Sequence, residues 1–317
     1  MTKDTPKQNP PGKPAVPLKG KAKVIAIAKE VGIILGAFLL LNNFVIASFL
    51  VPTGSMENEV MTGDLLFVNK FIYGGTTPRN LQQLDLFSMV TGGAIRLPYV
   101  ELPWFRLPAI RNVERGDVIV FVFPGYRDQV EQEEFQFYLK RCVGLPGDTI
   151  HLIDRELRVN GEPFPLPRNL KFSYRRTLTP DQVSDQIFPR GASWNEAFYG
   201  PLVVPFKGMT IALDAAHYRQ WEVFVRREGH DIRLENDLVL VDGNPVTEYV
   251  VEQDYLFGMG DHRDNSLDSR YWGFIPKDNL IGTPLFVYWS WDSDIPIYKI
   301  FARLGSVRFN RIGTLIR

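Results

Sequence analysis

Residues 31–56 read VGIILGAFLLLNNFVIASFLVPTGSM, a long apolar run that ends in a segment of small residues. The 21 residues from 31 to 51 are apolar apart from Asn42, Asn43 and Ser48. As an α-helix they would span about 31 Å, which matches a bilayer core of about 30 Å. A cleaved signal peptide would have a shorter apolar region, of about 7 to 15 residues, followed by a small-x-small cleavage site. We therefore predict a retained transmembrane anchor over residues 24–51.

The charges before this run predict its orientation. Residues 1–30 contain seven Lys against one Asp and one Glu, and residues 1–20 are rich in Pro and Lys without an apolar period. Such a composition is typical of disorder, and we predict a disordered basic tail over residues 1–23. The positive-inside rule places this tail in the cytoplasm, so the chain after residue 51 is expected on the outer face of the membrane.

Composition excludes several other classes of site. The chain has 36 basic and 36 acidic residues, so its net charge does not indicate a nucleic-acid partner. One cysteine, Cys142, cannot form an intramolecular disulfide or a Cys-based zinc site. The four His are scattered singly, without a metal-binding spacing. We predict no metal, no cofactor and no nucleic-acid partner.

The pattern after the anchor is that of β-structure. Short apolar runs at 64–70, 115–124, 137–143 and 280–289 are bounded by Gly, Pro and polar residues and predict strands. We expect a mainly β fold with an antiparallel main domain formed by residues 52–149 and 250–317. Two stretches between these parts end on Asn-Gly and Asp-Gly hairpin signals, which predicts an inserted smaller β subdomain over residues 150–249.

Residues 76–112 are apolar, interrupted by Pro and Gly, and show neither a helical nor a strand period. One interpretation is a loop folded over the core. The other is an apolar surface that rests on the membrane beside the anchor, because large exposed apolar patches mark such sites.

Ser55 stands where the chain leaves the apolar run, beside Gly54. A Ser in this setting is usually only part of a turn. To act as a nucleophile it needs a base. His262 is one candidate, since it lies near Asp261 and Asp264 and a Ser-His-Asp triad can be written.

Lys140 is the other candidate base. Tyr138 and Cys142 share its side of an apolar strand, whereas Arg141 takes the opposite side. A Lys in such a strand usually points to solvent, but if one side is buried, these neighbours favour the side of Lys140. Burial lowers the pKa of an ammonium, and a fall from about 10.4 to about 8 lies within the range known for buried Lys. The neutral amine could then accept the Ser proton.

Residues 260–270, GDHRDNSLDSR, alternate acids with Arg. A solvated loop would explain these charges, but the alternation also suits a buried ion-pair cluster that pins a loop. Ser266 within it offers a hydroxyl that could hold a Lys amine in place.

Taken together, these segments resemble the bacterial type I signal peptidases, the Ser/Lys membrane proteases of peptidase family S26. Five motifs carry the resemblance in the family's order, at residues 52–56, 63–70, 115–121, 138–148 and 260–270. Residues 76–112 and about 160–245 match poorly. The resemblance implies a membrane-anchored serine endopeptidase that removes signal peptides from exported preproteins. It would act through an acyl-enzyme and cut after small-x-small residues.

The resemblance also implies a role for each motif residue. Ser55 would be the nucleophile and Lys140 the general base. The Thr53 hydroxyl and the Ser55 backbone N–H would form the oxyanion hole. Ser266 would orient the lysine, in a loop supported by two charged residues, Asp268 and Arg270. The substrate pocket would be lined by five residues: Val51, Met56, Val60, Tyr138 and Leu139.

The sequence departs from the family pattern at two places. Asn58-Glu59 stand where the family commonly has Pro and Thr, which affects the loop after the nucleophile, and His262 replaces a frequent Asn. The implied partners are signal peptides of secreted preproteins and membrane lipid, with the protein-export translocon as a further candidate. The implied location is the bacterial cytoplasmic (inner) membrane, with the catalytic domain outside.

Two rival classes share part of this pattern. A self-cleaving Ser/Lys repressor protease would carry a DNA-binding domain where this chain has its apolar run. A catalytically inactive, membrane-tethered β scaffold or binding module would not require Ser55, Lys140 and Ser266 together.

Overall fold

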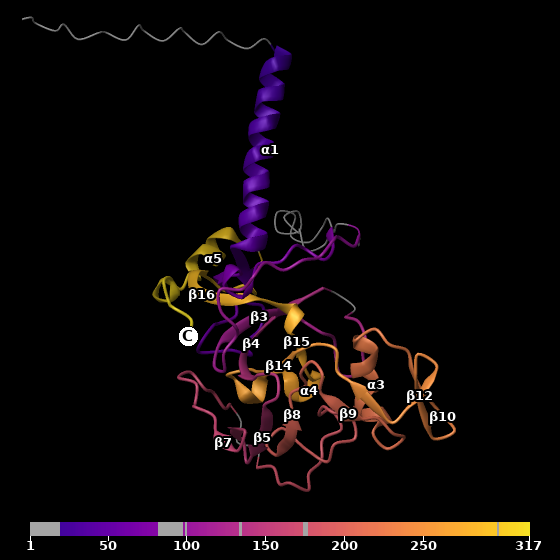
Figure 1. The fold of residues 1–317 in the computed structure, drawn as a ribbon. Coiled ribbons are helices and arrows are strands. Elements are labelled where there is room, and N and C mark those ends of the chain that lie inside the picture. The colour runs from indigo at the N-terminus through magenta and orange to yellow at the C-terminus, as the bar shows by residue number, and fades with distance from the viewer. Residues whose placement is uncertain (1–19, 82–97, 99, 133–134, 174–176, 297) are drawn as a thin grey trace, which may run out of the picture. The chain divides into compact units, whose positions relative to one another are not determined.

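A computed structural model of the chain describes residues 20–81, 98, 100–132, 135–173, 177–296 and 298–317. Helix α1 (Gly20–Phe44) is the first element, and it is continuous over 25 residues (Figure 1). It is long and apolar enough to cross a membrane, and the described residues contain one such helix. Residues 1–19 of the expected disordered tail lie outside the described residues, whereas residues 20–23 belong to α1, so the prediction of disorder is wrong there.

The apolar run does not stay helical to residue 51. Helix α1 ends at Phe44, and strand β1 (Ile46–Leu50) follows it. The prediction of a helix to residue 51 is therefore wrong over residues 45–51. The reason is that the branched and aromatic side chains of this segment suit a pleated sheet as well as a bilayer. Strand β1 pairs antiparallel with β2 (Asp64–Asn69).

This earlier end of the helix accounts for the two asparagines of the apolar run. Asn42 and Asn43 lie in the last turn of α1 and not at the middle of a longer span. The Lys70 ammonium donates a hydrogen bond to the Asn42 carbonyl at 3.2 Å. A cation at this position satisfies a terminal carbonyl and interacts favourably with the negative end of the helix dipole.

Residues 41–317 form one compact unit built on a seven-stranded antiparallel sheet. Its strand order is β1-β2-β16-β3-β4-β14-β15. The strands not yet given are β3 (Val118–Val122), β4 (Phe137–Gly144), β14 (Tyr255–Met259), β15 (Ile275–Pro276) and β16 (Leu280–Ser290). Strand β16, the last along the chain, thus lies between the early strands β2 and β3. The predicted mainly β, antiparallel fold is confirmed.

Smaller sheets fill the segment between β4 and β14. A four-stranded sheet contains β5 (Thr149–Ile153), β6 (Glu156–Val159), β7 (Glu162–Pro163) and β8 (Tyr199–Val203). Two further sheets contain β9 (Thr210–Ala212) with β13 (Glu248–Val250), and β10 (Ile232–Glu235), β11 (Leu238–Val241) and β12 (Asn244–Val246). The expected hairpin turns occur at residues 160–161 and 242–243, where all four residues have positive φ, as type I′ turns require.

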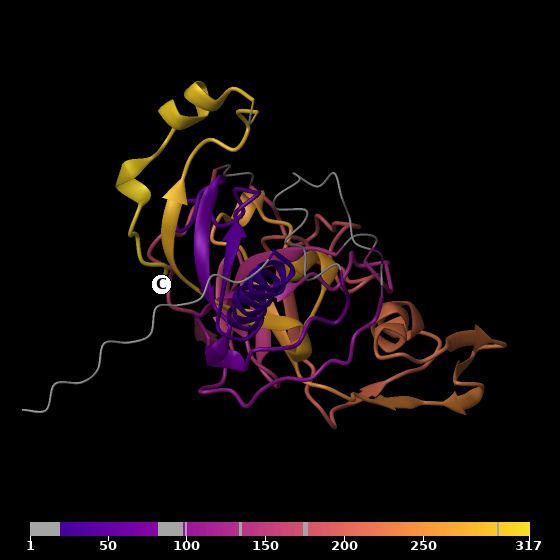
Figure 2. The ribbon, with the colours of Figure 1, turned by 90° about the horizontal axis from the view of Figure 1, so that it is seen from above.

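Sequence reasoning did not predict helix α3 (Tyr218–Arg227) in this region. Its buried side chains, Trp221, Phe224 and Val225, follow the i, i+3, i+4 spacing of an amphipathic helix, so the signal was present. Figures 1 and 2 both show α3 and β10–β12 on one side of the main sheet, with α5 (Ile300–Gly305) on the other. The remaining short helices are α4 (Ser269–Trp272), η1 (Phe71–Tyr73), η3 (Arg263–Asn265), η4 (Lys277–Asn279) and η5 (Phe309–Arg311).

The described part of the segment 76–112 is a backbone-paired arm. Residues 75–81 run antiparallel to 100–107, with hydrogen bonds such as Thr77 N to Phe105 O at 3.1 Å. Residues 82–97 and 99 lie outside the described residues. Trp104, Phe105 and Ile110 are 36%, 51% and 66% exposed, so the arm presents apolar side chains on its surface.

Candidate active site

The turn after β1 brings Ser55 to Lys140 on β4. The Lys140 Nζ lies 2.7 Å from the Ser55 Oγ, although the two residues are 85 positions apart. Both side chains are buried, at 8% and 3% exposure. A second hydrogen bond, from Lys140 Nζ to the Leu139 carbonyl at 3.1 Å, fixes the amine further.

The backbone closes the nucleophile turn at its base. The Val51 N–H donates to the Asp64 carbonyl, and the Gly63 N–H donates to the Val51 carbonyl, each at 2.9 Å. Residues 52–62 therefore form a loop whose two ends continue the pairing of β1 with β2. Because β2 pairs with β16 and β16 with β3, the sheet carries this loop to a fixed position near β4.

Both faces of β4 are buried at this point. Lys140 and Arg141 are 3% and 5% exposed, so the expectation of one buried side was wrong. Arg141 tolerates burial because Asp261 neutralises it through a bidentate pair, with Nε–Oδ1 and Nη2–Oδ2 distances of 2.8 and 2.5 Å. No comparable ion pair neutralises Lys140 among the residues that the structure describes.

The environment of Lys140 disfavours its charged form. Burial lowers the pKa of its ammonium from 10.5 to about 8, while the carboxylates of Asp268 and Asp261 act in the opposite direction. A substantial fraction of the side chain is therefore a neutral amine at mildly alkaline pH. A neutral amine 2.7 Å from a hydroxyl can accept its proton.

The loop 260–270 contains the ion pair expected from its sequence. Arg270 Nε and Nη2 each lie 2.9 Å from the Asp268 carboxylate, and both residues are almost fully buried. The Asp268 Oδ2 also accepts the Gly260 N–H at 3.1 Å, and Arg270 donates to the Arg263 carbonyl at 2.7 Å. These bonds join the start and the end of the loop.

Ser266 does not make the contact expected of it. Its side chain is buried, but its Oγ has no hydrogen-bond partner in the described part of the chain. It packs against Gly260, where an added Cβ would lie 2.2 Å from Ser266 Oγ and 2.5 Å from the Ser55 carbonyl oxygen. The hydroxyl thus lies beside the nucleophile turn, and its role in orienting Lys140 stays a prediction.

The two expected oxyanion donors belong to the nucleophile turn. Thr53 is exposed, and neither its hydroxyl nor the Ser55 N–H has a hydrogen-bond partner among the described residues. Both groups are therefore available to a substrate carbonyl.

The five expected pocket residues do not line one open cavity. Val51, Met56 and Val60 are 6%, 1% and 0% exposed and belong to a single hydrophobic cluster, against which Leu139 packs. Tyr138 packs in another cluster and stacks on Phe123 with ring centroids 4.2 Å apart. The role of these residues as a substrate pocket stays a prediction.

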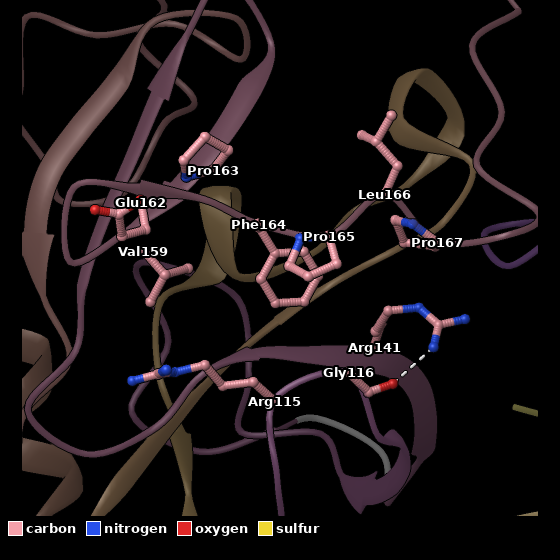
Figure 3. A pocket seen from close by; sticks show the side chains of 10 residues that line it. All are labelled: Arg115, Gly116, Arg141, Val159, Glu162, Pro163, Phe164, Pro165, Leu166 and Pro167. Atoms are coloured by element: carbon pink, nitrogen blue, oxygen red, sulfur yellow. Dashed lines mark hydrogen bonds between the residues drawn. The ribbon is translucent and has the colours of Figure 1, made fainter.

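A cavity of about 410 Å³ lies in another part of the described chain (Figure 3). Arg115, Gly116 and Arg141 form one wall, and residues 162–167, which comprise β7 and the segment after it, form the opposite wall. Arg141 donates to the Gly116 carbonyl and is paired with Asp261, so its charge is already satisfied. Since Arg141 and Lys140 point to opposite faces of β4, this cavity is not part of the Ser55 site.

His262 lies close to the nucleophile turn but not on the nucleophilic oxygen. Its Nε2 is 2.5 Å from Ser173 Oγ, and its Nδ1 is 3.3 Å from the Gly54 carbonyl. Asp261 is engaged by Arg141. The Ser-His-Asp interpretation is therefore wrong, because Lys140 holds the position that a base would need.

Sequence reasoning missed a brace around the nucleophile loop. The Glu59 carboxylate, 5% exposed, accepts Asn169 Nδ2 at 2.6 Å and the Arg317 N–H at 2.7 Å. Arg311 donates to Asp64 Oδ2 at 2.5 Å and to the Glu59 carbonyl at 3.1 Å. The signal available was the unusual Asn58-Glu59, but the partners are more than 100 positions away and could not be paired with it.

Comparison with known proteins identifies relatives of this chain. The family described as signal peptidase, peptidase S26, matches residues 24–289. Signal peptidase I of Rickettsia bellii is 29% identical over 289 residues, covering 86% of this chain and 79% of the relative. That of Pseudomonas aeruginosa is 28% identical over 281 residues (85% and 74%), and that of Helicobacter pylori 26% over 261 residues (80% and 78%).

A crystal structure of a signal peptidase I from Enterococcus faecalis is also similar, with 23% identity, a TM-score of 0.27, and coverage of 55% of this chain and 98% of that chain. The family match covers more than half of the chain. The chain belongs to the signal peptidase family, peptidase S26. It is a serine peptidase of the signal peptidase I type.

Proposed function

We propose that this chain removes signal peptides from exported preproteins, with Ser55 as the nucleophile and Lys140 as the general base. The observation that carries the proposal is the buried contact of 2.7 Å between Ser55 Oγ and Lys140 Nζ. Family membership supports the same reaction, since the relatives are signal peptidases.

The reaction would proceed through an acyl-enzyme. The neutral Lys140 amine takes the Ser55 proton as Oγ attacks the carbonyl carbon of the scissile peptide. The resulting ammonium returns that proton to the departing amine as the C–N bond breaks. The neutral Lys140 amine next takes a proton from water as the water oxygen attacks the ester carbon. The ammonium returns that proton to Ser55 Oγ as the ester C–O bond breaks, which restores both residues.

The tetrahedral intermediates carry a negative charge on the former carbonyl oxygen. The Thr53 hydroxyl and the Ser55 N–H would donate to it. Loss of one such donor typically costs about 10²- to 10³-fold in kcat. Both groups belong to the loop whose base is fixed by β1 and β2, so they and the nucleophile move together.

An open sheet edge offers a place for the substrate backbone. The bond from Cys142 N to the Asp117 carbonyl shows that even-numbered residues of β4 direct their polar groups to β3. Phe137 and Leu139 therefore direct theirs to the other edge. Strand β14 pairs with that edge only along residues 141–144, which leaves the first half of β4 open in the described chain.

A peptide added as a strand to this edge would place alternate side chains on one face. The residues one and three before the cleaved bond would then meet the apolar wall that contains Val51, Met56 and Leu139. This wall is closely packed, so it favours small side chains at both positions. The proposed specificity is therefore small-x-small, of the Ala-x-Ala kind.

The membrane part of the proposal has separate support. Helix α1 exposes its apolar side chains, which suits a retained anchor in the bacterial cytoplasmic membrane. The basic residues before it place the N-terminus in the cytoplasm and the catalytic unit outside. Trp104, Phe105 and Ile110 supply apolar surface for contact with lipid, and the translocon stays a candidate partner.

Cleavage of a purified preprotein in detergent tests the dyad. Ser55→Ala and Lys140→Met should each lower kcat by at least about 10³-fold. When two residues act as a unit, loss of either one removes most of the rate. Exposed Lys207 provides the control, and Lys207→Met should cleave like the wild type. Full activity in both dyad variants would refute the mechanism, and a wild-type chain without activity would favour the scaffold.

A further inference from the structure

His262 contacts two successive backbone carbonyls of the nucleophile turn. Its backbone N–H donates to the Ser55 carbonyl at 3.1 Å, and its Nδ1 lies 3.3 Å from the Gly54 carbonyl. The side chain is 4% exposed, so water does not compete freely for these bonds. The residue is thus in contact with the turn without touching the Ser55 hydroxyl.

The Gly54 carbonyl matters because of the peptide unit to which it belongs. This oxygen and the Ser55 N–H lie on the same planar group and point in opposite directions. The Glu57 N–H donates to this oxygen at 3.0 Å, and His262 Nδ1 lies 3.3 Å from it. A donor held on the oxygen therefore fixes the direction of the N–H. It also polarises the peptide unit, which makes that N–H a stronger donor.

The surroundings of the imidazole determine where its proton lies. Nδ1 faces two acceptors, the Gly54 carbonyl and the Glu57 carboxylate at 3.2 Å, so it must carry a proton to satisfy them. Lys171 Nζ lies 3.0 Å from Glu57 and, as the largest contribution, lowers the pKa of that carboxyl. Ser173 contacts Nε2 at 2.5 Å and holds the other end of the ring.

We propose that His262 is a positioning residue for the oxyanion hole. It holds the Gly54–Ser55 peptide so that the Ser55 N–H points at the carbonyl oxygen of the bound preprotein. Residues 171 and 173 of the inserted segment orient the ring, so the insert contributes to catalysis through His262. This inference rests on the proposed function, because it assigns a support to one of the proposed oxyanion donors.

Two variants of the full-length protein in detergent test the proposal. His262→Leu removes the ring donor, and kcat for preprotein cleavage should fall about 10-fold with KM changed by less than about 2-fold, because a misaligned donor costs less than a lost one. His262→Asn keeps an amide donor near the Nδ1 position and should recover most of that loss. In both variants the pH at which activity rises should stay that of the wild type, since Lys140 remains the base.

The outcomes separate this role from a structural one and from the dyad itself. A His262→Leu enzyme with wild-type kcat would overturn the positioning role, and so would equal losses in the Leu and Asn variants. If His262→Leu does not fold, Ser173→Ala provides the readout, with an expected fall in kcat of about 2- to 3-fold at unchanged KM; no change would overturn the proposal. Activity that survives Ser55→Ala would instead refute the proposed function.

Discussion

At the scale of single residues, the reactivity of Lys140 comes from where it is buried. A pKa lowered from 10.5 to about 8 corresponds to about 3 kcal/mol against the charged form. Because the folded-state value lies below the unfolded one, the unfolded chain binds the proton first as the pH falls. The fold therefore bears this cost in full below about pH 8, and the cost disappears as the pH rises toward 10.5.

The same shift predicts the pH dependence of cleavage. Protonated Lys140 cannot take the Ser55 proton, so kcat/KM should rise about tenfold per pH unit below the pKa and level off above about pH 8. Initial rates on a preprotein between pH 5 and 10 measure this profile. An enzyme as active at pH 5 as at pH 8 would contradict a lysine base.

A second buried lysine makes a matched control for this profile. Burial also lowers the pKa of Lys70 to about 8, but its amine contacts the Asn42 carbonyl and not the nucleophile. Lys70→Met should therefore keep the rise in activity near pH 8. If Lys70→Met loses the rise, the titrating group would be Lys70 and not Lys140, and the prediction would be contradicted.

At the scale of elements, the site depends on segments that brace the nucleophile loop from outside. The Glu59 carboxylate accepts hydrogen bonds from the Asn169 side chain and from the Arg317 backbone N–H, and it lies 4.0 Å from Arg141. Arg141 follows Lys140 in β4 and pairs with Asp261. The nucleophile loop, the base strand and the loop 260–270 are thus connected through one buried charge network.

Removal of Glu59 should weaken this network. Glu59→Ala leaves the Asn169 amide and the Arg317 N–H without their acceptor, and the free energy of unfolding should fall by about 2–4 kcal/mol. Glu59→Gln keeps one acceptor oxygen and should lose about half as much. Urea unfolding measures both effects.

A double-mutant cycle provides the control for this prediction. Glu59→Ala and Asn169→Ala remove the two ends of one contact of 2.6 Å, so their effects should be less than additive. Strict additivity would show that the contact does not contribute to stability.

Four strands could be predicted from the sequence because their pattern is local. The strands at 64–70, 115–124, 137–143 and 280–289 are short apolar runs between turn residues, and all four occur. Strand β1 was missed because its apolar residues continue a helical run without a break. Helix α3 was missed because the neighbouring hairpin signals outweighed its spacing.

Some residues of the candidate site could likewise be predicted from local sequence, and others could not. Ser55, Lys140, Asp268 and Arg270 belong to local motifs, which a single sequence can display. The contacts of Glu59 and His262 join segments far apart along the chain. They depend on the sheet order, which local pattern does not determine.

At the scale of the whole molecule, the inserted segment shares its core with the catalytic sheet. One hydrophobic cluster runs from Ile150 and Val159 through Trp221 to Phe257 and Phe274. The boundaries 150–249 for a separate subdomain stay a prediction, but this shared core argues that the insert does not unfold alone. Cooperative unfolding is the expectation for residues 41–317, which form one compact unit.

Arg227 at the end of α3 allows this coupling to be tested. Its guanidinium donates to the carbonyls of Gly125, Tyr126 and Gln129 at 3.0, 2.7 and 2.9 Å, and burial lowers its pKa to about 10. Arg227→Met removes these three hydrogen bonds, and the free energy of unfolding should fall by about 2–4 kcal/mol. Arg227→Lys should recover only part of the loss, because an ammonium cannot reproduce the planar fork.

Unfolding of the Arg227→Met variant tests whether the insert and the main sheet unfold together. Tryptophan fluorescence follows Trp194 and Trp221 in the insert together with four tryptophans outside it, Trp104, Trp272, Trp289 and Trp291. Residual cleavage follows Ser55. If the insert and the sheet form one cooperative unit, fluorescence and activity should be lost at the same urea concentration in the wild type and at the same lower concentration in the variant. A fluorescence change that precedes the loss of activity would show that the insert opens independently. In that case its residues Lys171 and Ser173 could not hold the nucleophile turn in the way that we propose.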